Sequence, residues 1–245
     1  MSIWGKIVGG AAGLALGGPI GLLVGAVGGH FVDRMRVDQE PDPERAKRSV
    51  GFTIAVIVLG AKMAKADGVV TPDEVEAFKE VFQVPESEMK NVARVFNQAR
   101  KDAHGYEPYA EQVAGMFRGS PEVLEELLWC LAHIAKADNV IHPGELEFLK
   151  NVSSIFGFDE ETFERVTALR VDGADADPYR LLGVSPDATD EEIKAAHRSL
   201  VLENHPDRLI AQGMPEEFVN VANERLAKIN AAHDRIRQMR GGKSA

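Results

Sequence analysis

The N-terminal part of the chain is one uninterrupted apolar stretch. Lys6 is the only charged residue before Asp33, and the run from Ile7 to Phe31 contains no Asp, Glu, Lys or Arg. About 20 consecutive apolar residues are enough for a helix to cross the hydrocarbon core of a bilayer. The pattern therefore predicts a single transmembrane helix within residues 1–32, followed by a polar linker over residues 33–49.

Within this run, glycine recurs at every fourth position. Four residues advance a helix by about 400°, so such glycines form one slowly winding stripe. A stripe of this kind lets two helices approach each other closely in lipid. We therefore predict a homodimer formed through Gly9, Gly13, Gly17, Gly21 and Gly25. A glycine-rich anchor that spans alone and a flexible soluble leader are the alternatives that the pattern leaves open.

Basic residues on the two sides of the run indicate its orientation. Arg34 and Arg36 follow the run, whereas Lys6 and the chain's amino group precede it. Since cytoplasmic flanks of membrane helices are enriched in Lys and Arg, the bias favours a cytoplasmic C-terminal body.

Helical periodicity dominates from residue 50 to residue 171, and one pattern within it occurs twice. The segments 64–76 (AKADGVVTPDEVE) and 135–147 (AKADNVIHPGELE) lie 71 residues apart and share eight of their thirteen residues. In each copy an apolar helix ends, a turn follows, and a proline begins the next helix, as proline favours the first helical position. The repeat predicts an all-helical domain with internal symmetry over 50–171.

Four acidic residues occupy equivalent positions in the two copies: Asp67, Glu74, Asp138 and Glu145. We expect them mainly to form the turns and cap the helices, because acidic side chains stabilise helix N-termini. A partner-binding surface and a site for a hard cation are the alternatives, since carboxylates suit such cations. The paired pattern resembles the TerB-like family, which implies an all-helical fold and acidic turns linked to metal or partner contact.

Residues 177–240 carry a second helical pattern after a short acidic linker over 172–176. A short helix is expected to end at Gly183, and Thr189 with Glu192 forms a predicted capping box for the next helix. A third helix is expected over 215–239. The last two helices should pair as an antiparallel hairpin, with His205-Pro206-Asp207 in the connecting loop.

These motifs, in this order, resemble the J-domain family. The segment DPYRLLGV begins at Asp177, EEIKAAHRSL precedes the His-Pro-Asp tripeptide, and KINAAH follows it. The opening Trp4-Gly5-Lys6-Ile7, the TerB-like middle and the C-terminal position of the J domain are similar to the DjlA family of membrane-anchored co-chaperones. That resemblance implies a bacterial inner-membrane protein with one span and cytoplasmic domains.

The resemblance also implies a partner, a DnaK-type chaperone, whose ATPase the J domain would stimulate and which it would recruit to clients that the sequence does not identify. The DnaK-binding residues would be His205, Pro206, Asp207, Lys194, Arg198 and Arg208. Asp207 would offer a carboxylate to a chaperone arginine, and the basic helix face would steer toward an acidic surface. Ala195, Ser199 and Glu203 make this face less basic than is usual in the family, so we expect weaker or more selective binding.

Composition excludes several other classes of protein. The net charge is −10, and residues 33–176 carry 17 basic against 27 acidic side chains, which argues against nucleic acid as a partner. A single cysteine, Cys130, excludes internal disulfides and Cys-based zinc clusters. No phosphate-binding loop or nucleophile–base set is present, so we predict neither an enzyme nor a cofactor.

Two functions follow from these patterns. The first is a membrane-anchored co-chaperone in which the middle domain selects the client while the C-terminal domain recruits DnaK. The alternative is a TerB-type envelope-stress or metal-responsive protein with an accessory J domain.

Overall fold

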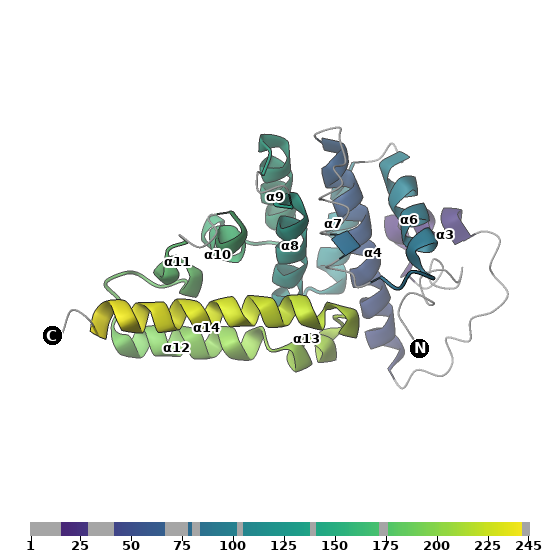
Figure 1. The fold of residues 1–245 in the computed structure, drawn as a ribbon. Coiled ribbons are helices and arrows are strands. Elements are labelled where there is room, and N and C mark those ends of the chain that lie inside the picture. Colours follow the sequence, from purple (N-terminus) through teal and green to yellow (C-terminus); the bar gives the residue numbers. More distant parts are fainter. Residues whose placement is uncertain are drawn as a thin grey trace.

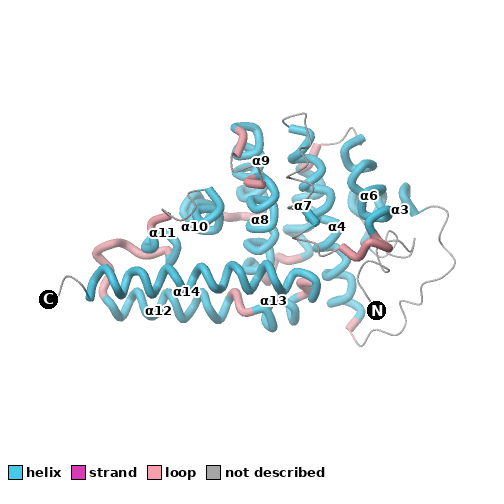
Figure 2. Tube along the Cα trace, viewed as in Figure 1, coloured by secondary structure: helices cyan, strands magenta, loops and turns pink. Residues whose placement is uncertain are grey.

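The computed structural model describes residues 16–28, 42–66, 78–79, 84–101, 105–137, 141–171 and 176–241. Within these ranges the chain forms helices and no strands, which confirms the predicted all-α class for the described part (Figure 2).

Helix α4 (Pro43–Ala66) is the centre of the middle domain. Every residue from Val50 to Ala64 is buried, as expected for a helix that is apolar on nearly all sides. Four helices pack around it (Figure 1), namely α6 (Met89–Lys101), α7 (Glu107–Met116), α8 (Pro121–Ala135) and α9 (Pro143–Ile155). Helix α10 (Glu160–Val171) packs on α8 and leads toward the C-terminal domain.

The second copy of the repeat has the local structure that its sequence predicts. Helix α8 ends at Ala135, and α9 begins with Pro143 at its first position. The backbone N–H of His142 donates to Oε2 of Glu145 at 2.9 Å, which closes the start of α9. Trp129 and Cys130 lie in the core, as expected for side chains in the apolar run of α8.

The C-terminal domain is built around a long helical hairpin. Helix α11 (Pro178–Leu182) is followed by α12 (Asp190–Glu203), and α12 lies side by side with α14 (Val219–Gly241) (Figure 1). The predicted capping box is present, with Thr189 N donating to Glu192 Oε2 at 2.7 Å and Glu192 N donating to Thr189 Oγ1 at 3.2 Å.

The connection between α12 and α14 differs from the predicted loop. Residues Pro206–Gln212 form a short helix, α13, and Glu216–Phe218 form a turn of 3₁₀ helix before α14. The reason is local: proline fits the first helical position, and the ring of His205 accepts the N–H of Asp207 as an N-cap. The tripeptide therefore begins a helix instead of lying in an open loop.

The N-terminal segment also differs from the predicted continuous helix. Helix α3 (Gly18–Gly28) begins at Gly18, and the φ angles of Gly17 and Gly18 at its start, 59° and 57°, are left-handed. A right-handed helix cannot pass through such residues, so the glycine stripe does not run as one helix across Gly17. Gly21 and Gly25 lie on α3, whereas Gly9 and Gly13 lie outside the described residues. No helix in the described part of the chain has the length and hydropathy that a membrane crossing requires.

Residues 16–23 pack on the middle domain. Ile20 is fully buried, and Leu16 and Leu23 belong to the same apolar core. The side chain of Gln112 on α7 accepts the N–H of Ile20 at 2.9 Å and donates to the carbonyl of Gly17 at 2.9 Å. These contacts place the start of α3 against α6 and α7.

The middle and C-terminal domains share one apolar core. Leu209, Met214 and Phe218 are at most 1% exposed and belong to the cluster that surrounds α4. The rings of Phe218 and Phe52 meet edge to face with centroids 4.9 Å apart. The far end of the hairpin, by contrast, packs on α11 in a separate smaller cluster. The hairpin is therefore anchored to the middle domain at its α13 end.

Candidate functional site

The His-Pro-Asp tripeptide lies at the start of α13 and faces solvent. The side chain of Asp207 is 90% exposed and that of His205 is 51% exposed, whereas Pro206 is buried. Nδ1 of His205 accepts the N–H of Asp207 at 3.2 Å. This bond holds the imidazole beside the carboxylate and leaves the oxygens of Asp207 open to a cationic partner.

The two basic residues predicted on the preceding helix also face solvent. Lys194 and Arg198 are one turn apart on α12 and both are exposed, so they share one face of that helix. Further along α12, the hydroxyl of Ser199 donates to Oε1 of Glu203 at 2.7 Å. The carboxylate of Glu203 is thus held on the helix two residues before the tripeptide.

The sixth predicted docking residue, Arg208, forms an ion pair with the middle domain. Its guanidinium lies 2.9 Å from Oε1 of Glu122 on α8, and its side chain remains 48% exposed. The same Oε1 accepts a hydrogen bond from the Gln212 amide at 2.6 Å. Five of the six predicted docking residues are thus exposed and Pro206 is buried, and the structure places an unpredicted acid, Glu122, next to Arg208.

A buried ion cluster lies beside this contact. Arg225 of α14 is 3% exposed and donates to Glu125 at 2.6 Å and to Glu126 at 3.3 Å. Glu125 also accepts from Arg165 of α10 at 2.7 Å. Burial alone would raise the pKa of Glu125, but the guanidiniums of Arg225 and Arg165 outweigh it and hold that pKa below its ordinary value. Both carboxylates therefore have a direct cationic partner in the domain interface.

Sequence reasoning missed these four acidic and basic residues, because partners separated by 100 positions leave no local pattern. A signal existed in their surroundings. Arg225 occupies the 3–4 spacing of the buried face of α14, between Ala222 and Ile229. A charge on an apolar face requires a partner, because burying it unpaired is costly.

Two histidines stack in the middle of the hairpin. The rings of His197 on α12 and His233 on α14 are 4.1 Å apart and nearly parallel. Nε2 of His197 lies 2.8 Å from Oδ1 of Asn230. Burial, and secondly the neighbouring His197, lower the pKa of His233 below its ordinary value. The lowered pKa favours the neutral form of His233 within this stacked pair.

Of the four acidic turn residues, only Glu145 lies within the described residues. It is 1% exposed and caps α9, which is the role that we considered first for this set. Asp67, Glu74 and Asp138 lie outside the described residues, so the metal and partner alternatives stay predictions. Among the side chains that the structure describes, no group of three or more His, Cys, Asp and Glu could hold a metal ion.

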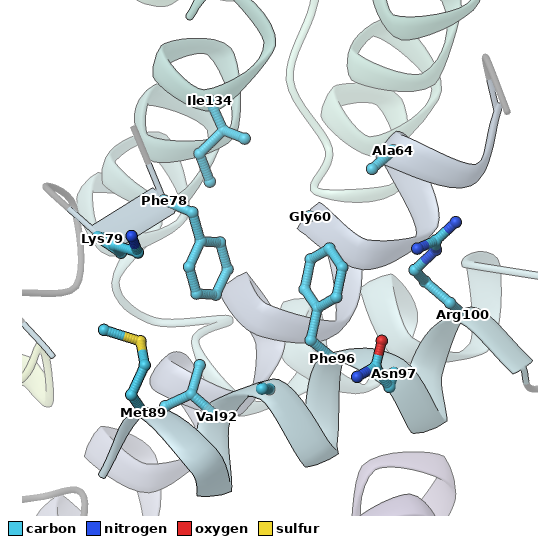
Figure 3. A pocket seen from close by; sticks show the side chains of 11 residues that line it. Gly60, Ala64, Phe78, Lys79, Met89, Val92, Phe96, Asn97, Arg100 and Ile134 are labelled. Carbon is cyan, nitrogen blue, oxygen red and sulfur yellow. The ribbon is translucent and has the colours of Figure 1, made fainter. Parts of the chain in front are cut away.

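The middle domain also contains an apolar pocket of about 260 Å³ between α4, α6 and the end of α8. Phe78 and Phe96 point into it (Figure 3), and their rings meet edge to face with centroids 5.6 Å apart. Arg100 and Asn97 lie along its edge. None of its lining residues belongs to the C-terminal domain, so the pocket is separate from the tripeptide.

Comparison with protein families divides the chain into three parts. The model of the Co-chaperone DjlA transmembrane domain matches residues 1–48, that of Tellurite resistance protein TerB matches residues 53–168, and that of the DnaJ domain matches residues 177–238. The three matches follow the order that the sequence predicts.

Curated relatives match along nearly the whole chain. Co-chaperone protein DjlA of Vibrio parahaemolyticus is 30% identical, and the match covers 82% of this chain and 82% of that protein. Co-chaperone protein DjlA of Photobacterium profundum is 29% identical over 98% of this chain and 100% of the relative. Co-chaperone protein DjlA of Escherichia coli is 24% identical over 99% of this chain and 100% of the relative. No solved structure matches the chain significantly.

Proposed function

The chain belongs to the DjlA family of J-domain co-chaperones, and from that membership we propose that it binds a DnaK-type chaperone, stimulates its ATPase and recruits it to client proteins at a membrane. The chain itself makes and breaks no covalent bond in this function. It acts as an adaptor that favours the ATP-hydrolysing state of its partner.

The observation that carries the proposal is the exposed tripeptide at the start of α13. Asp207 is 90% exposed, and its backbone N–H is fixed by the ring of His205. An exposed carboxylate on a backbone fixed in this way is suited to a two-point contact with an arginine of the partner, which is among the stronger polar contacts available. His205 and Pro206 supply the backbone geometry that aims it.

The basic face of α12 supports the same function. Lys194 and Arg198 are exposed on the helix that leads into the tripeptide, so an acidic chaperone surface would meet both elements together. Glu203 reduces the positive charge near the tripeptide, which favours a moderate affinity.

We further propose a single membrane span near the N-terminus, with the other domains in the bacterial cytoplasm and with dimerisation through the glycine stripe. The match of residues 1–48 to the DjlA transmembrane family and the charge-free run Ile7–Phe31 support it. Insertion requires the contacts of residues 16–23 with the middle domain to be released, because Ile20 cannot lie in lipid and under α7 at once. Accessibility of single cysteines introduced before and after the run, measured in intact cells, tests this topology. Cysteines on both sides that react only after lysis would contradict a span.

Single-turnover ATP hydrolysis by the DnaK of the same organism tests the docking function. The full chain in lipid vesicles should accelerate hydrolysis, and His205→Gln and Asp207→Asn should each remove the acceleration. Asp187→Asn is a matched control, because Asp187 is an exposed acid of the same domain in the loop before α12. Wild-type chain that leaves the hydrolysis rate unchanged would contradict the proposed function.

A further inference from the structure

Three acids of the middle domain lie on the face of α8 that meets the C-terminal domain. Glu122, Glu125 and Glu126 are spaced by three and four residues, so they share one side of the helix. Glu122 is 8% exposed and Glu126 is fully buried. Buried carboxylates need partners, and the partners come from the hairpin: Arg208 and Gln212 for Glu122, and Arg225 for the other two.

The helix that carries the tripeptide depends on contacts from outside itself. Helix α13 has seven residues, and a helix of that length is unstable alone. One oxygen of Glu122 receives Arg208 from the start of α13 and Gln212 from its end. On the same helix, the carbonyl of Ile210 accepts from Nε of Arg45 on α4 at 3.1 Å. Two helices of the middle domain therefore hold α13 along its length.

These contacts support the tripeptide without covering it. The side chains of His205 and Asp207 remain 51% and 90% exposed, and Lys194 and Arg198 are exposed on α12. Glu122 binds Arg208 and Gln212 and makes no contact with Asp207 that would cover its carboxylate, which is 90% exposed. The geometry is therefore that of a support behind the docking surface and not of a blocking contact.

We propose that Glu122 is a positioning residue for chaperone docking, through which the TerB-like domain fixes α13 and orients the His-Pro-Asp tripeptide. The inference rests on the proposed function and extends it: the docking unit is the J domain together with α8, and the middle domain takes part in partner binding without touching the partner. Loss of the carboxylate removes one of the contacts that hold α13, so the helix samples other orientations more often and each docking event must then order it again.

The test compares Glu122→Gln with the wild-type full chain in lipid vesicles. Gln keeps the size of the side chain and removes the charge that Arg208 and Gln212 share. Glu147→Gln is the matched control, because Glu147 is an exposed acid in the middle of α9. Amide hydrogen exchange of residues 207–212 measures the order of α13 without any chaperone. A titration of DnaK single-turnover hydrolysis gives the half-maximal concentration and the maximal rate separately.

For Glu122→Gln we expect exchange in α13 to become about fivefold faster, as one charge-assisted contact is lost. The half-maximal concentration should rise by a similar factor, about fivefold, while the maximal rate stays at the wild-type value and the thermal midpoint falls by no more than about 4 °C. A purely structural role would lower the thermal midpoint and leave the half-maximal concentration of the folded fraction unchanged.

The outcomes separate this inference from the proposed function. If the wild-type chain fails to stimulate DnaK, the function is wrong, and faster exchange in Glu122→Gln would still show that Glu122 orders α13. If wild type stimulates and Glu122→Gln has wild-type exchange and half-maximal concentration, the positioning role is overturned. Equal effects of Glu147→Gln and Glu122→Gln would overturn it as well.

Discussion

Arg225 of α14 donates to Glu125 of α8 at 2.6 Å, across 100 positions of the chain, at a point where its side chain is almost completely buried. Nearby, Phe218 meets Phe52 in the core that surrounds α4. The C-terminal domain is therefore joined to the middle domain by both an apolar core and a buried ion cluster.

Removal of Arg225 should destabilise the joined domains strongly. Arg225→Ala leaves the carboxylates of Glu125 and Glu126 buried without that guanidinium, and breaking a buried pair in this way costs about 3–5 kcal/mol. Denaturant unfolding of the full chain measures the loss of unfolding free energy. Arg237→Ala, an exposed basic residue on the same helix, should change it by less than about 0.5 kcal/mol. Similar values for the two variants would show that the buried cluster contributes little.

The J domain separated from the middle domain should be less well folded at its α13 end. A fragment of residues 177–241 exposes Leu209, Met214 and Phe218, which are at most 1% exposed in the full chain. Each loses about 1.5–3 kcal/mol of burial, so α13 should exchange its amide hydrogens faster and the fragment should bind a hydrophobic dye. Exchange rates for residues 207–212 in the fragment that equal those in the full chain would argue for two independent modules.

If the J domain depends on the middle domain in this way, the middle domain supports chaperone docking in addition to the client selection that the sequence suggested.

The local elements were predictable from sequence, because their causes are local. Thr189 and Glu192 lie three residues apart and form the capping box, and Pro143 begins α9 as proline does in many helices. The hairpin followed in the same way from the spacing of apolar residues along α12 and α14.

What the sequence did not reveal has long-range causes. The partners Arg208 and Glu122 are far apart in the chain, and nothing near either one indicates the other. On α14, Leu226 is half-buried, whereas its neighbour Arg225 is buried. The spacing of apolar residues alone would favour leucine at position 225. Arginine is stable there because acidic side chains of α8 pair with it.

Acidification should weaken the hairpin through His233. Burial, and then His197, hold the pKa of His233 below its ordinary value of about 6.5, with Asp234, Arg237 and Lys194 as the other charged neighbours. At this histidine the folded state therefore binds fewer protons than the unfolded chain. The contribution of His233 to the free energy of unfolding is fully present above about pH 6.5 and is lost as the pH falls below that value. The thermal midpoint at pH 7.5 and 5.5 measures the effect.

A matched pair of variants isolates this histidine. His233→Phe keeps an aromatic ring against His197 and cannot be protonated, so the difference between the two midpoints should shrink. His142→Asn removes a histidine at the start of α9 and retains an N-cap, so it should preserve the wild-type difference. An undiminished difference in His233→Phe would assign the pH dependence to other groups.

The basic face of α12 should control the rate and the salt dependence of chaperone binding. Lys194→Ala and Arg198→Ala each remove one exposed charge from the face that leads into the tripeptide. Because exposed charges act mainly by steering association, each variant should raise the half-maximal concentration for DnaK stimulation by about two- to fivefold at low salt.

The effect of each variant should be smaller at 0.5 M salt, where screening shortens the range of these charges to about 4 Å. Glu203→Gln should act in the opposite direction, since it removes the acid that Ser199 holds two residues before the tripeptide. Arg118→Ala is the control, because Arg118 is an exposed basic residue just after α7, in the middle domain. If Lys194→Ala and Arg198→Ala match that control at low salt, the docking surface does not extend along α12 and is confined to α13.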